Sequence, residues 1–139
     1  MIVLDTNVIS EPLKPRPDAH VLAWLDAQDP GTLYLTATSL SELLLGIELL
    51  PGGKRKRTMM AAVQHVLDRL FADRFLPFDR EAAIASSRVA SRTAARGYAI
   101  SVADCQIAAI AEVHGFSVAT RDTAPFRMAG VPIVNPWED

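Results

Sequence analysis

The sequence lacks several features that mark specialised classes of protein. It has a single cysteine, Cys105, so it cannot form an internal disulfide, and this favours a reducing compartment. No apolar run approaches the roughly 20 residues that a membrane-spanning helix needs. The first apolar run has no basic segment before it and is interrupted by Asp5, which argues against a signal peptide. We therefore expect a cytoplasmic protein with no membrane partner.

A large excess of either charge is also missing. The formal net charge of −2 argues against binding nucleic acid by bulk positive charge alone, although a nucleic-acid enzyme could use metal ions as its local positive charge. What is present is typical of a globular chain, since 50% of the 139 residues are hydrophobic and 22% are charged. There is no internal repeat, low-complexity tract or linker. The sequence thus predicts one domain over residues 1–139.

The opening residues give the first indication of the fold. Residues 2–4 are consecutively apolar without alternation, which favours a strand covered on both faces, as in the parallel sheets of α/β proteins. In such sheets ligands bind beyond the carboxyl ends of the strands. Asp5 stands directly after this strand. It is therefore either part of a functional site or the N-terminal cap of the next helix.

Strands and helices are predicted to alternate along the rest of the chain. Further strands are expected over residues 33–36, 75–78, 116–120 and 131–134, and helices over 19–28, 38–50, 54–71, 80–96 and 101–114, with a proline-rich loop over 11–17. This alternation predicts an α/β fold with a mostly parallel central sheet flanked by helices.

Two of the expected helices carry an acid on a face that otherwise resembles a core-facing one. At 100° per residue, Glu42 shares its face with Leu45 and Leu49, which predicts that this face turns to the interior. Asp104 shares its face with small apolar residues that include Ile107 and Ala108. A buried lone carboxylate is costly, and a cation would remove that cost.

The same two acids also have a purely structural explanation. Ser39-x-x-Glu42 fits a capping box, and Ser101-x-x-Asp104 is a weaker version of that motif. In this interpretation both carboxylates close helix N-termini, where negative charge is favoured. Capping and a functional role can coexist, so the motif alone does not decide between them.

A fourth acid points to the same edge of the sheet. Asp122 follows the strand expected over 116–120, and its alternative role is that of a turn residue. Together with Asp5, Glu42 and Asp104 it would make a cluster of carboxylates without histidine or cysteine. Such a cluster suits a hard cation, Mg²⁺ or Mn²⁺, which keeps waters for a phosphate-ester substrate.

The blocks that carry these acids resemble a PIN-domain ribonuclease over the whole chain. They are Asp5-Thr6-Asn7, Ser39-x-x-Glu42-Leu43 with Gly46, Asp104 to Ala109, and Val118 to Asp122, in the family's order and spacing. The segments Leu4 to Pro12, Leu76 to Asp79, Thr120 to Thr123 and Asn135 to Trp137 are similar to the FitB branch of the VapC toxins. The resemblance implies a three-layer α/β/α domain and a divalent-metal-dependent endoribonuclease, the toxin of a type II toxin–antitoxin pair.

The resemblance also implies roles for individual residues. It places Asp5, Glu42, Asp104 and Asp122 in one acidic metal site. Our hypothesis for the mechanism is that Asp5 and Asp104 bind the metal directly, whereas Glu42 and Asp122 bind it through water or orient the attacking water. Thr6, Ser39 and Arg121 would support this site. Many members carry a further acid just before the phenylalanine of the last motif, where this chain has Pro125 before Phe126, so Asp122 is the only acid on that side.

The resemblance further implies partners. They are an RNA substrate, a small antitoxin that binds operator DNA, and a second copy of the chain in a homodimer. The run Lys54-Arg55-Lys56-Arg57 is either a solvated helix start or a contact for the RNA backbone, and Arg121 could meet a phosphate or pair with the adjacent acid. The alternative function is a non-catalytic PIN-like protein that mainly docks an antitoxin or DNA-binding protein.

Overall fold

The computed structural model describes residues 1–138, so Asp139, the last residue of the predicted domain, lies outside the described residues. Its strands are β1 (Ile2–Leu4), β2 (Leu33–Thr36), β3 (Phe75–Leu76), β4 (Ser117–Ala119) and β5 (Ile133–Val134). Its α-helices are α1 (Thr6–Ser10), α2 (Ala19–Ala27), α3 (Ala37–Glu48), α4 (Lys54–Leu70), α5 (Arg80–Ala95), α6 (Val102–His114) and α7 (Thr123–Ala129). Two short 3₁₀ turns, Glu11–Leu13 and Pro30–Thr32, complete them.

The five strands form one sheet in the order β3-β2-β1-β4-β5, and every neighbouring pair is parallel. β1 is the central strand, with Val3 opposite Tyr34 on one side and Val118 on the other. The carboxyl ends of all the strands therefore meet at one edge, as predicted.

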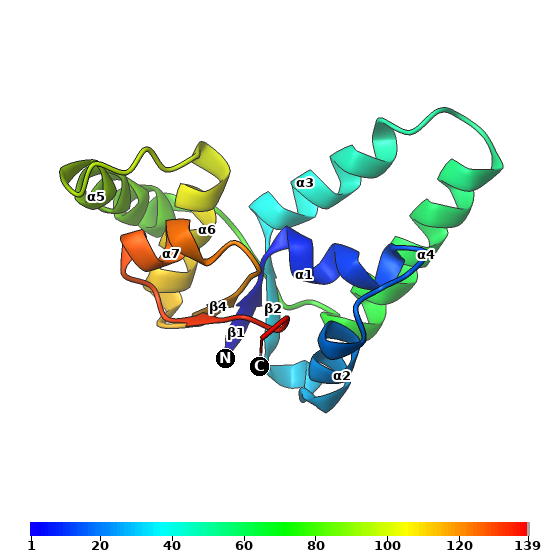
Figure 1. The fold of residues 1–139 in the computed structure, drawn as a ribbon. Helices are drawn as coiled ribbons and strands as arrows, with labels where there is room; N and C mark the ends of the chain where they lie inside the picture. Colours follow the sequence, from blue (N-terminus) through cyan, green and yellow to red (C-terminus); the bar gives the residue numbers. More distant parts are fainter. Residues whose placement is uncertain (139) are drawn as a thin grey trace.

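Helices cover both faces of this sheet (Figure 1). Val3 packs into a core with α5, α6 and α7, whereas the next residue, Leu4, packs into a second core with α1 to α4. The alternation follows from the period of two along a strand. The predicted three-layer α/β/α architecture is confirmed. Within residues 1–138, no helix combines the length and the apolar character needed to cross a membrane.

Most of the expected helix boundaries are confirmed by their caps. The Asp18 carboxylate accepts hydrogen bonds from two backbone amides of α2, and the Asp79 carboxylate accepts one from α5. The Ser101 hydroxyl caps α6, which ends at Gly115 in the left-handed conformation with φ of 70°.

Four local predictions, of one loop and three strands, need correction. The loop expected over 11–17 contains the 3₁₀ turn Glu11–Leu13, because a proline is compatible with the first turn of a helix. The strands expected over 75–78, 116–120 and 131–134 shorten to two or three residues. Helix α7, which begins directly after Asp122, is an addition to the elements expected from the sequence.

Candidate functional site

Asp5 lies at the carboxyl end of the central strand and is 6% exposed. Its Oδ1 accepts a hydrogen bond of 2.8 Å from the Thr6 backbone amide, so it does cap α1. Its Oδ2 accepts hydrogen bonds from the Thr120 hydroxyl at 2.8 Å and from the Asn7 side-chain amide at 3.3 Å. The capping role and a place in the site therefore coexist in this residue.

The environment of Asp5 opposes its ionisation. Burial, chiefly, raises the pKa of its carboxyl from an ordinary 3.8 to about 6, while the hydrogen bonds from Thr120 and Thr6 lower it and the charges of Asp104 and Glu42 raise it. Desolvation therefore outweighs repulsion between carboxylates as the cause of the raised pKa. A nearby cation would stabilise the ionised form of this buried carboxylate.

Glu42 reaches the same edge from α3. The Thr6 hydroxyl donates to its Oε1 at 2.9 Å, so these two site candidates are in direct contact. However, the prediction that Glu42 faces the interior is wrong, because Glu42 is exposed and Leu45 and Leu49 are 56% and 75% exposed. The helix instead buries the row Ser39, Leu43 and Ile47.

The capping box predicted for α3 is also wrong. The cap is Thr36, whose hydroxyl accepts a hydrogen bond from the Ser39 amide at 3.0 Å, so the helix begins three residues earlier than that motif requires. This shift leaves Ser39 inside the first turn, fully buried. Its hydroxyl has no hydrogen-bond partner among residues 1–138 and does not contact the acids as a donor.

Asp104 lies in the first turn of α6, where its backbone amide donates to the Ser101 hydroxyl at 3.1 Å. Its neighbours Ile107 and Ala108 are fully buried, as the face of small residues predicted. The pKa of the half-buried Asp104 carboxyl is raised, chiefly by burial and further by the charge of Asp122. Asp5, Glu42, Asp104 and Asp122 are therefore linked electrostatically at one edge of the sheet.

Thr120 connects the two strand-end acids, and sequence reasoning missed it. Its fully buried hydroxyl donates to Asp5 Oδ2 and accepts the Asp122 amide at 3.1 Å. Asn7 adds to this connection by accepting the Arg121 amide at 3.3 Å through its Oδ1. The sequence places Thr120 only at the end of the strand expected over 116–120, although a short polar residue there can also orient an adjacent carboxylate.

Replacing Thr120 with valine is expected to reduce the free energy of unfolding by about 1–3 kcal/mol, because it removes the shorter of the two hydrogen bonds to Asp5 Oδ2 and leaves the Asp122 amide without its partner. Urea unfolding measures this loss. Thr120→Ser is the matched control, because it keeps the hydroxyl and removes only a methyl group. Equal loss in both variants would mean that packing, and not the hydroxyl, is the source.

The donors at this edge fit a hard divalent cation. They are four carboxylates, with no thiol or imidazole among the site residues, which is the oxygen-rich chemistry that Mg²⁺ and Mn²⁺ prefer. Within residues 1–138, no three acid, histidine or cysteine side chains stand close enough to enclose an ion. The arrangement accordingly suits an ion bound by one or two carboxylates that retains several waters.

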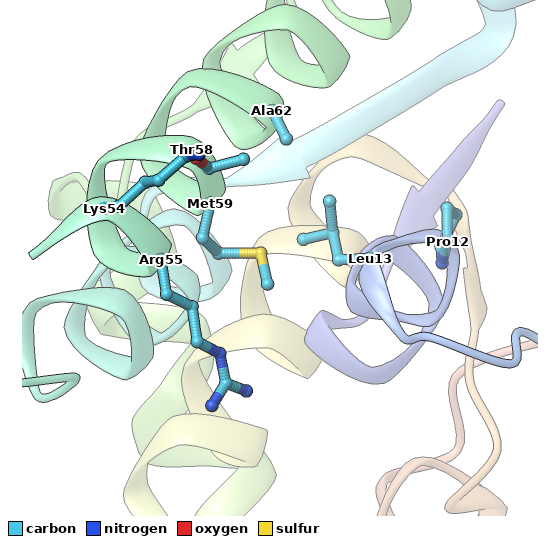
Figure 2. A pocket seen from close by; sticks show the side chains of 7 residues that line it. All are labelled: Pro12, Leu13, Lys54, Arg55, Thr58, Met59 and Ala62. Carbon is cyan, nitrogen blue, oxygen red and sulfur yellow. The ribbon is translucent and has the colours of Figure 1, made fainter.

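The basic run at the start of α4 lies apart from the acids. Lys56 binds Glu48, with its ammonium 2.9 Å from the Glu48 carbonyl oxygen and 3.7 Å from its carboxylate. Lys54 and Arg55 border a largely apolar hollow of about 640 Å³ between α4 and the Glu11–Leu13 turn (Figure 2). In this view Met59 reaches from α4 toward Leu13, so the hollow has an apolar floor and a basic end.

Comparison with known proteins places this chain and its fold in a family. The model of the PIN domain matches residues 2–131. The chain is 48% identical to the VapC ribonuclease Y4jK of Sinorhizobium fredii over 99% of both chains, and 45% identical to Toxin FitB of Neisseria gonorrhoeae over 100% of both. It is also similar to a structure of FitAB bound to an IR36 DNA fragment, with a TM-score of 0.94, 44% identity and coverage of 99% and 96% of the two chains. The chain therefore belongs to the PIN-domain family, within the VapC group that includes FitB.

Proposed function

We propose that this protein is a divalent-metal-dependent endoribonuclease and the toxin of a type II toxin–antitoxin pair. One observation carries the proposal: the buried Asp5 carboxylate, with its raised pKa, feels the charges of Asp104 and Glu42 at the carboxyl edge of the sheet. Neither a cap nor a core position requires this convergence of charge. The names of the related proteins, VapC ribonuclease and Toxin FitB, support the assignment.

In the proposed mechanism each acid has a separate task. Asp5 and Asp104 would hold Mg²⁺ or Mn²⁺, which would supply Lewis-acid chemistry for activating a water and for offsetting charge on the scissile phosphate. Glu42, oriented by the Thr6 hydroxyl, and Asp122, whose backbone is held by Thr120, position the attacking water for displacement in line with the leaving oxygen. Thr120 and Asn7 fix the Asp5 carboxylate in place.

The apolar hollow beside α4 is the proposed seat of the antitoxin. Its floor of Leu13 and Met59 suits apolar side chains, and Lys54 and Arg55 suit an acidic residue of the partner. The related FitAB complex was solved on DNA, which supports an antitoxin that binds operator DNA. We further propose that two copies of the chain pair in a homodimer and act on cytoplasmic RNA.

Removing divalent metal is expected to abolish RNA cleavage. The purified chain, free of partner, would be incubated with a mixed panel of RNAs in Mg²⁺ or Mn²⁺, with chelator, and with metal restored after chelation. Cleavage that disappears with chelator and returns with metal supports the proposal, because the acids alone cannot neutralise the phosphate. A folded chain that binds its antitoxin but cuts no RNA in any metal would support the docking function instead.

A further inference from the structure

We propose that Arg121, held against the ring of Trp137, is a binding site for a phosphate of the RNA strand beside the carboxylates. The inference rests on the proposed function, since it assigns a contact for the same substrate. The Arg121 guanidinium carbon lies 5.3 Å from the centre of the Trp137 ring, which is within the range of a cation–π interaction.

The Trp137 ring is itself fixed in place. The Trp137 amide donates to the Asn135 side-chain oxygen at 3.0 Å, and its carbonyl oxygen lies 3.3 Å from Nδ1 of His20 on α2. The ring packs against the core beneath α1 to α4. It thus provides a rigid surface on which the guanidinium rests, and it reduces the entropy that Arg121 loses when it binds a ligand.

The backbone of Arg121 belongs to the hydrogen-bond network of the site. Its amide donates to Asn7, whose side chain also donates to Asp5, and the next residue is Asp122. The guanidinium is therefore tied to the same structure that positions two of the acids. A cation so placed contacts the backbone of a strand whose scissile phosphate lies at the acids.

The charge of Arg121 is available for such a contact. It was predicted either to pair with the adjacent acid or to meet a phosphate, and within residues 1–138 it forms no ion pair with a carboxylate. Its side chain is exposed. A guanidinium that stacks on an aromatic ring keeps its N–H donors at its edge, where they match the oxygens of a phosphate.

The charge of the rest of the molecule favours an anion-binding residue at this place. The four carboxylates repel a polyanion, and the chain as a whole carries a formal charge of −2. The basic run at the start of α4 lies at the hollow, with Lys56 engaged by Glu48. Arg121 supplies positive charge directly beside Asp122, where RNA must approach.

Equilibrium binding of a mixed-sequence single-stranded RNA oligonucleotide would test the inference. The full chain carrying Asp104→Asn serves as a non-cleaving parent, and its affinity is measured at several salt concentrations in Mg²⁺. Adding Arg121→Gln is expected to weaken binding about tenfold and to reduce the slope of log affinity against log salt by about 0.7, the value for one phosphate contact on a single strand. Arg127→Gln, at an exposed arginine on α7, is the matched control for loss of one charge.

A second variant separates the stacking from the charge. Trp137→Leu keeps Arg121 but removes its aromatic surface, so affinity is expected to fall about two- to fivefold with an unchanged salt slope. Equal effects of Arg121→Gln and Arg127→Gln on RNA binding would overturn the inference. An Arg121→Gln variant that binds RNA normally and its antitoxin more weakly would overturn it as well. In either case metal-dependent cleavage by the wild type would still support the proposed function. Failure of the proposed function would appear as no RNA binding by the Asp104→Asn parent and no cleavage by the wild type.

Discussion

Replacing Asp104 with asparagine is expected to reduce RNA cleavage by at least about 10³-fold, since the loss of a proposed metal ligand would remove several kcal/mol of transition-state stabilisation. The fold is expected to survive, because Asp104 is only half buried and its backbone amide, which binds Ser101, is unchanged. Asparagine keeps the shape of the side chain and removes its charge. Initial rates on one RNA substrate at saturating Mg²⁺ measure the effect.

The control for this experiment is Asp73→Asn, which removes an exposed carboxylate from the turn after α4 and is expected to leave the rate unchanged. Asp104→Asn should also weaken Mg²⁺ or Mn²⁺ binding in a calorimetric titration. Near-wild-type cleavage by Asp104→Asn would show that the metal site lies elsewhere. Loss of cleavage with undiminished metal binding would assign Asp104 to the substrate and not to the metal.

Replacing Asp5 with asparagine is expected to stabilise the metal-free protein at pH 8 while abolishing its activity. The pKa of Asp5 is about 6 in the folded protein and an ordinary 3.8 in the unfolded chain. As the pH falls, Asp5 is therefore protonated in the folded state before it is protonated in the unfolded chain. Proton binding by Asp5 stabilises the fold fully below pH 3.8, and this stabilisation is lost as the pH rises through about 6. The difference between the two pKa values means that the ionised Asp5 destabilises the folded protein by about 3 kcal/mol at pH 8.

The asparagine variant should recover only part of this free energy, about 1–2 kcal/mol. Its oxygen still accepts the Thr6 amide, but its NH₂ group meets the NH₂ group of Asn7, which loses its acceptor. Urea unfolding in chelator at pH 8 and pH 4.5 would measure the effect, with a gain at pH 8 that shrinks at pH 4.5. Added Mg²⁺ should stabilise the wild type and not the variant. A variant less stable than the wild type at pH 8 would contradict the destabilisation assigned to the ionised Asp5.

The sequence allowed prediction of the architecture and of the edge where the acids meet. The unbroken apolar run before Asp5 predicted a strand buried on both faces, a second strand was expected before Asp122, and parallel strands necessarily bring their carboxyl ends together. The face of Asp104 was also predicted correctly, because its small apolar neighbours suit close packing. These inferences depend on periodicity and strand order, which sequence patterns report well.

The remaining errors concern side-chain direction and short polar contacts. Leu45 and Leu49 share the face of Glu42, but the position of α3 over the sheet buries the row of Leu43 and Ile47 instead. Helical periodicity contains two possible apolar faces here, and only tertiary packing chooses between them. Helix α7 had its own signals, with Pro125 in its first turn and Gly130 after its end.

The central position of β1 has a consequence for synthesis of the protein. The Asp5 carboxylate is held by Thr120, a residue 115 positions later in the chain. The pairing of β1 with β4 and the completion of the acidic edge must therefore wait until nearly the whole polypeptide has left the ribosome. A nascent or prematurely terminated chain carries Asp5 and Glu42 without Asp104 and Asp122, so the ribosome that makes the enzyme is not exposed to its activity until synthesis is almost finished.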